Sequence, residues 1–276
     1  TSTASTGYGS DMRIKPDLTH FYDNIYTTYS STGYGQFGGT SGATPCTVGH
    51  FGLLMQMWHA GVFPGFGGGA SVFADRPKST TAKALMINNA YRYNWKAGGS
   101  NANMWRNRQG WGMAHPGNLY TNRNKLFIIN ETDIIKPLEK RTYELTVPPG
   151  EPEFAATLVY IDVQGNPAVQ TQHRVNDLSL RVISPSQVSY WGNNGMWDTN
   201  SGQQGGPDGD NWTAPGGSRD VKNTTENVFL QNPEAGKWQV IISGDEITKD
   251  THVETPALDA DYALVVRGVI AAAPPC

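Results

Sequence analysis

The strongest candidate for chemistry in this chain is the stretch Gly39-Thr40-Ser41-Gly42-Ala43-Thr44-Pro45. A serine at the start of a helix has its hydroxyl and its own N–H near the positive end of the helix dipole. Its small neighbours leave the hydroxyl accessible, and both the Ser41 N–H and the Thr40 hydroxyl could donate to an oxyanion. From these residues alone, a serine that caps a core helix is the more common arrangement.

A nucleophilic serine needs a general base, and the chain offers no obvious one. His50 follows nine residues along the same expected helix, about 13 Å away at 1.5 Å per residue. The other histidines lie in no recognisable motif, and we expect structural or surface roles for them: His20, His59, His115, His173 and His252. A base for Ser41 is therefore expected from outside the chain.

Acidic residues suggest a second kind of site. Calcium takes six to eight oxygen ligands, mostly from carboxylates and carbonyls. Five aspartates in and before a long polar loop could gather such oxygens: Asp162, Asp177, Asp198, Asp208 and Asp210. Their spacing does not match an EF-hand, and a solvated acidic loop explains them equally well. The sequence thus allows structural Ca²⁺ without assigning its ligands.

Two helices are expected in the first half of the chain, at 41–59 and 79–91. The first has apolar residues on nearly all sides, which predicts burial in the middle of a domain, and Gly49 and Gly52 suggest close approach of a neighbouring backbone. After about residue 125, six stretches are expected to be strands: 126–129, 142–147, 156–161, 178–183, 238–242 and 262–266. Strands without intervening helices predict a β-sandwich, and 193–222 is expected to be a long loop. The predicted organisation is an α/β segment over 1–124 and an all-β domain over 125–276.

The composition fits a loop-rich extracellular protein. Of 276 residues, 16% are charged, well below the roughly 25% of average soluble domains. The net charge of -3 predicts no electrostatic attraction to nucleic acid or acidic membranes, and no apolar run is long enough to span a bilayer. Cys46 and Cys276 form no disulfide framework, and a buried place in the core is expected for Cys46. Asn130, Asn211 and Asn223 begin glycosylation sequons, which leaves glycosylation open.

The serine stretch resembles the nucleophile motif of the subtilisin-like serine proteases, Gly-Thr-Ser-X-Ala-X-Pro. The chain resembles that family both before the motif, at 13–17 and 24–28, and after it, at 83–90 and 109–112. Further stretches are similar to the jelly-roll domain that follows the catalytic domain in one branch of the family: 175–180, 226–230, 233–238 and 261–266. The resemblance covers nearly the whole chain. It implies a subtilisin-like catalytic segment, C-terminal part only, followed by a jelly-roll sandwich that often holds calcium.

The chain departs from that family in instructive ways. Gly42 replaces the usual Met, which removes an oxidisable sulfur and suggests open space on the leaving-group side. Cys46 stands where the family commonly has His. Most importantly, the family's Asp, His and oxyanion Asn precede the serine, and the forty residues before Ser41 contain none of their motifs.

The resemblance therefore implies a secreted, proteolytically processed serine endopeptidase. Its missing groups would come from an N-terminal part or second chain of the same protease, and its substrate would be a polypeptide. This chain alone is expected to be inactive. Two alternatives stay open: a non-catalytic remnant that serves as a structural or binding module, and an enzyme whose first half has been cut away.

Overall fold

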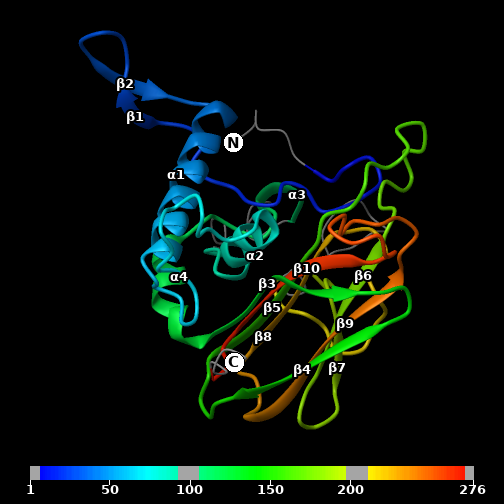
Figure 1. The fold of residues 1–276 in the computed structure, drawn as a ribbon. Helices are drawn as coiled ribbons and strands as arrows, with labels where there is room; N and C mark the ends of the chain where they lie inside the picture. Colours follow the sequence, from blue (N-terminus) through cyan, green and yellow to red (C-terminus); the bar gives the residue numbers. More distant parts are fainter. Residues whose placement is uncertain (1–6, 93–105, 197–210, 271–276) are drawn as a thin grey trace.

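The first part of the chain holds a small hairpin and, within the residues that the structure describes, all of the helices. The computed structural model describes residues 7–92, 106–196 and 211–270. Its elements up to residue 125 are β1 (Ile25–Thr28), β2 (Tyr34–Phe37), α1 (Thr40–His59), α2 (Ser79–Asn88), α3 (Arg106–Gln109), α4 (Pro116–Asn122) and the 3-10 turn η1 (Arg123–Lys125). The β1–β2 hairpin stands away from the body of the molecule, and α1 runs down one side of that body (Figure 1).

Two antiparallel sheets make up the rest of the molecule. The strands are β3 (Leu126–Ile135), β4 (Lys140–Val147), β5 (Glu153–Val159), β6 (Asp177–Ile183), β7 (Ser189–Trp191), β8 (Thr225–Gln231), β9 (Gly236–Glu246) and β10 (Ala260–Arg267). One sheet has the order β3-β10-β5-β8 and the other β4-β9-β6-β7. The chain is therefore a mixed α and β protein in which the described strand pairs are antiparallel.

The two sheets enclose a common hydrophobic core. In β9, Trp238, Val240 and Ile242 are buried, and they share one apolar cluster with alternate residues of the other sheet, such as Leu264 and Val266 of β10. Successive side chains of a strand point to opposite faces of its sheet, so every second side chain of these strands points into the space between the two sheets. The alternation that predicted strands in the sequence is thus the pattern that closes the sandwich.

The opposite face of the β3-β10-β5-β8 sheet is covered by helices. Ala263 and Val265 point to this side and lie in one cluster with Leu85 of α2 and with Leu54 and Trp58 of α1. Figure 1 shows α2 between α1 and the sheets. The segments before and after residue 125 therefore share an apolar core.

A single buried amide fixes α2 on the sheet. The Asn88 Nδ2 donates to the carbonyl oxygens of Ala155 and Val265 and to the Thr157 hydroxyl, at 3.0–3.1 Å. These acceptors belong to β5 and β10, so the end of α2 is held above the middle of the sheet. Buried amides rarely lack partners because an unmade bond is costly.

The expected elements compare well with the structure. All six expected strands are present, and the helix expected at 41–59 is α1. The helix expected at 79–91 ends at Asn88, because Tyr91 is extended and exchanges backbone hydrogen bonds with Met113. The sequence did not lead us to expect β2, β7, β8, α3 or α4. Of the expected loop 193–222, residues 193–196 and 211–222 are described and contain no strand or helix; 197–210 lie outside the described residues.

Candidate active site

Ser41 is the second residue of α1 and is exposed. The helix begins after Gly39, whose φ of 90° lies in the left-handed region that glycine adopts most easily. The Gly39 carbonyl already accepts the N–H of Gly42 at 2.9 Å. The N–H groups of Thr40 and Ser41 precede the first regular helical bonds, so they are the donors that a helix leaves free. The expected position of both residues at a helix start is confirmed.

Gly42 is buried under the hairpin rather than facing open space. A Cβ built on Gly42 would lie 2.6 Å from Ile25 Cδ1 and 3.3 Å from Phe37 Cδ1. Ile25 and Phe37 are direct partners across the β1–β2 hairpin. The expectation that Gly42 opens space beside Ser41 is therefore wrong, because the hairpin fills that space.

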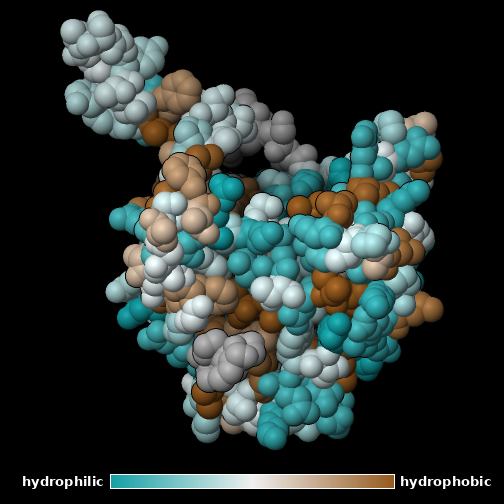
Figure 2. Space-filling view, viewed as in Figure 1, coloured by the Kyte–Doolittle hydropathy of each residue, from teal (hydrophilic) through white to brown (hydrophobic). Residues whose placement is uncertain are grey.

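Ser41 stands at the end of an uncovered face of α1. Exposed residues recur along the helix with helical spacing: Ser41, Thr44, Pro45, Val48, Gly49, Gly52, Leu53 and Gln56. Val48 is 62% exposed and Leu53 48%. In Figure 2 this side of α1 forms a column of mostly brown, tan and white residues. The expectation that α1 is buried on nearly all sides is wrong for the described chain. Only three residues of this helix are buried there: Gly42, Leu54 and Trp58.

The two glycines of this face, Gly49 and Gly52, have space around them in the described part of the chain. Within the described residues, a Cβ at Gly49 or Gly52 would meet no heavy atom within 4 Å. They lie three residues apart, which places them on the same side of the helix. The close neighbour expected from their sequence is thus not supplied by the described chain, and the helix backbone is open to another segment here.

The hairpin beside Ser41 is equally uncovered. Tyr26 and Tyr34 stack on each other with their ring centroids 5.9 Å apart, and they are 73% and 69% exposed. The hairpin forms a two-stranded sheet of its own. Two-stranded hairpins are marginally stable in water unless something packs against them.

No histidine of the chain contacts Ser41. His50 Nδ1 bonds the Ala114 carbonyl oxygen at 2.9 Å, and its ring lies 4.8 Å from that of His20. Burial lowers the pKa of His20, with a smaller contribution from His50. The remaining four have other partners: Asp75 for His59, Asn118 for His115, Ser10 for His173 and Asp259 for His252. Structural roles for the histidines are therefore supported.

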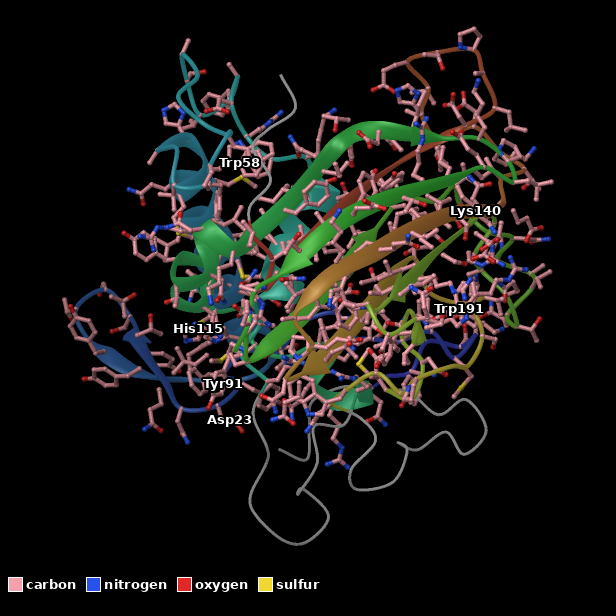
Figure 3. All side chains as sticks on the ribbon, turned by 90° about the horizontal axis from the view of Figure 1, so that it is seen from below. Asp23, Trp58, Tyr91, His115, Lys140 and Trp191 are labelled. Carbon is pink, nitrogen blue, oxygen red and sulfur yellow. The ribbon has the colours of Figure 1, made fainter. Side chains whose placement is uncertain are left out.

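Two further sequence expectations can be compared with the structure. His115 caps α4 by accepting the Asn118 N–H at 2.9 Å, and its ring lies 5.8 Å from that of Tyr91 (Figure 3). Cys46 is half-buried and free, so its expected burial in the core is wrong: it lies on the same partly open helix as Ser41. Cys276 lies outside the described residues.

Asp162 and Asp177, the described members of the expected calcium group, have partners within the protein. Both carboxylate oxygens of Asp162 accept backbone N–H groups, those of Val163, Val175 and Asn176. Asp177 lies between two arginine side chains, with an oxygen 3.6 Å from Arg174 and 3.4 Å from Arg219. Within the ranges that the structure describes, no group of three His, Cys, Asp or Glu side chains could hold a metal ion. Asp198, Asp208 and Asp210 lie outside those ranges, so calcium there stays a prediction.

A buried group of acids inside the sandwich was missed by the sequence reading. Asp177, Asp220 and Glu226 are all buried. Burial raises the pKa of Asp177 to about 6, against the opposing effect of Arg174 and Arg219. Burial also raises the pKa of Glu226 well above its usual value, and the neighbouring Asp220 adds to this. Alternation could have indicated only Glu226, which has the parity of the core residues Val228 and Leu230 of β8, because Asp220 precedes that strand.

Comparisons with known proteins give no family assignment. No family model and no curated protein matches the sequence. One similar solved structure is a Bacillus licheniformis lipase in its propeptide form, with 10% identity and a TM-score of 0.27. The match covers 54% of this chain and 22% of that protein, so the chain spans about a fifth of its length. None of the helices in the described ranges is long and apolar enough to cross a membrane.

Proposed function

We propose that the chain is the nucleophile-bearing part of a secreted subtilisin-like serine endopeptidase that is completed by an N-terminal part or second chain of the same protease. The observation that carries this proposal is the uncovered face of α1 with Ser41 at its end. That face combines an exposed serine, apolar side chains and two glycines whose added Cβ atoms would meet no other segment of the described chain. The resemblance of residues 39–45 to the subtilase nucleophile motif is the reason for assigning the role of nucleophile to Ser41.

In the proposed reaction, the Ser41 hydroxyl attacks the carbonyl carbon of a peptide bond. A histidine of the partner first accepts the serine proton and then delivers it to the leaving amine. The Ser41 N–H, helped by the Thr40 hydroxyl, donates to the developing oxyanion together with an asparagine of the partner. Water then hydrolyses the acyl-enzyme. A partner is proposed because none of the six histidines, all of which lie in the described ranges, is hydrogen-bonded to Ser41 there.

The partner would dock on the surface formed by the outer face of α1 and the β1–β2 hairpin. Glycines at 49 and 52 permit a backbone to approach the helix axis closely, and Val48 and Leu53 offer apolar area beside them. Burying apolar surface contributes roughly 25 cal/mol per Å², which would hold two cleaved pieces together. The following sandwich would be the jelly-roll domain of that family, with a stabilising role.

The test is peptidase activity of the native assembly on an unfolded protein substrate. We expect Ser41→Ala to abolish cleavage, since the nucleophile is lost. Ser79→Ala is the matched control, because Ser79 is also an exposed serine in the first turn of a helix but has no proposed role. Equal activity of the wild-type and Ser41→Ala assemblies would contradict the proposal and favour a non-catalytic remnant that binds other molecules through its sandwich.

A further inference from the structure

A cavity of about 420 Å³ lies between the N-terminal segment and the loops of the sandwich. Arg13, Lys15 and Asp17 line it from the N-terminal segment. Asp162, Arg174 and Lys222 line it from the sandwich. Its size is in the range of small-molecule sites. It is lined by a different part of the chain from the one that carries Ser41.

The acceptors of the cavity are already used. The Asp162 carboxylate accepts three backbone N–H groups. The Asp17 carboxylate lies 2.6 Å from the Lys15 Nζ through one oxygen and 3.1 Å from the Lys83 Nζ through the other. Neither carboxylate is therefore free to balance the remaining cations of the lining.

Donors of the cavity are left over. The Arg174 side chain is only 7% exposed. Its Nε donates to the Val221 carbonyl oxygen at 2.7 Å, and its Nη2 lies 3.5 Å from Glu246 and 3.6 Å from Asp177. Its buried Nη1 has no hydrogen-bond partner within the described residues. The Nε of Arg13 also has no hydrogen-bond partner there, but it lies 3.5 Å from the buried Asp11 carboxylate. Buried donors without partners are costly, which indicates that something else satisfies them.

The lining carries a net positive charge. Four of its side chains are cationic, Arg13, Lys15, Arg174 and Lys222, whereas two are anionic, Asp17 and Asp162. Carboxylates outside the lining also lie beside two of the cations: Asp11 beside Arg13, and Asp177 and Glu246 beside Arg174. The Lys222 ammonium bonds the backbone carbonyl of Thr171, which leaves its charge without a carboxylate there. Guanidinium groups match the planar fork of a carboxylate and the oxygens of a phosphate.

We propose that this cavity binds a small anion that bears a carboxylate or phosphate group, held by Arg174 with Lys222 and Arg13. Arg174 and Lys222 belong to the sandwich, whereas Arg13 belongs to the segment that leads to the hairpin and α1. A bound anion would thus join the two parts of the chain. The site is independent of the proposed peptidase function and neither needs Ser41 nor affects its assignment.

The test is isothermal titration of the native protein with inorganic phosphate and, separately, with succinate, at an ionic strength held constant with NaCl. We expect saturable binding of at least one of these two anions. Whichever anion binds shows whether the site takes a phosphate or a carboxylate group. Arg174→Gln should weaken binding by about ten-fold or more, the usual effect of losing a charged hydrogen bond. Lys222→Gln, at a more exposed position, should also weaken it and carries less risk to folding.

Arg219→Gln is the matched control. Arg219 is another arginine next to Asp177, but it does not line the cavity, so binding should be unchanged. The proposal is overturned if neither anion binds saturably. It is also overturned if Lys222→Gln and a folded Arg174→Gln bind as tightly as the wild-type protein, or if Arg219→Gln weakens binding as much as they do.

Discussion

Ile25 occupies the space that any side chain at residue 42 would need, since a Cβ on Gly42 would lie 2.6 Å from the Ile25 Cδ1. The hairpin therefore rests directly on the residue that follows Ser41. This contact couples the position of β1 to the start of α1. It also accounts for a glycine at a position where the family that the chain resembles usually has methionine.

Gly42→Met should displace the hairpin. Overpacking of this kind costs about 1–3 kcal/mol, so the free energy of unfolding in urea should fall by that amount. The double variant Gly42→Met with Ile25→Ala should recover part of the loss, because the smaller residue makes room for the methionine. A single variant as stable as the wild-type chain would show that Ile25 moves aside freely.

The open glycines predict opposite effects in the chain alone and in the assembly. Gly49→Ala and Gly52→Ala each meet no neighbouring atom within the described residues and should raise the stability of the isolated chain by up to about 1 kcal/mol, from helix propensity. In the assembly, the added methyl groups would obstruct a closely packed partner. Urea unfolding measures the first effect, and co-purification of the N-terminal chain measures the second.

The control for the second effect is Lys140→Ala, at an exposed position of β4 outside the proposed docking surface. It should leave co-purification unchanged. Unimpaired association of both glycine variants would mean that the partner does not approach this face.

The buried acids predict that the sandwich loses stability as the pH rises. The pKa of Asp177 is raised by burial from 3.8 to about 6, so the folded chain binds a proton that the unfolded chain has already released. This contribution is fully present below about pH 3.8 and is lost as the pH rises through about 6. About two pKa units correspond to about 3 kcal/mol, and Glu226 acts in the same direction.

Urea unfolding between about pH 4 and pH 8 tests this prediction. The asparagine in Asp177→Asn cannot titrate. The free energy of unfolding of this variant should therefore decline less with rising pH than that of the wild-type chain. A wild-type stability that rises over this range, with the same slope in the variant, would contradict the assignment.

Asn88→Ala should loosen α2 from the sheet. The substitution leaves the Ala155 and Val265 carbonyls and the Thr157 hydroxyl without their shared donor, and each such loss costs about 1–3 kcal/mol. We expect the free energy of unfolding to fall by several kcal/mol, which is about the cost of two such losses. Asn124→Ala, at an exposed asparagine, is the control and should have little effect.

The sequence could predict the regular parts of the fold but not how much of α1 is covered. Strands such as β9 and β10 alternate apolar and polar residues, and this period is a local property. β8 was not predicted because Glu226 and Asn227 break the apolar pattern, although both are buried. The exposure of Val48 could not be predicted, because an apolar residue has the same sequence signal whether its partner lies in the chain or outside it.

The candidate site was predicted in part for the same reason. Residues 39–45 place Ser41 at a helix start, which the structure confirms. The role of Gly42 depends on Ile25, a contact across the hairpin that no local pattern records. The cavity lined by Arg13 and Arg174 depends on residues more than 150 positions apart, so only the folded structure brings them together.

The most direct test of the central claim is labelling with a fluorophosphonate probe, followed by peptide mass spectrometry. The native assembly, the same sample after denaturation and the isolated chain should be compared, with a known subtilisin-like protease as a positive control. We predict an adduct on Ser41 in the native assembly and none in the denatured sample or the isolated chain. An unlabelled Ser41 in the native assembly, with the control protease labelled alongside, would contradict the account.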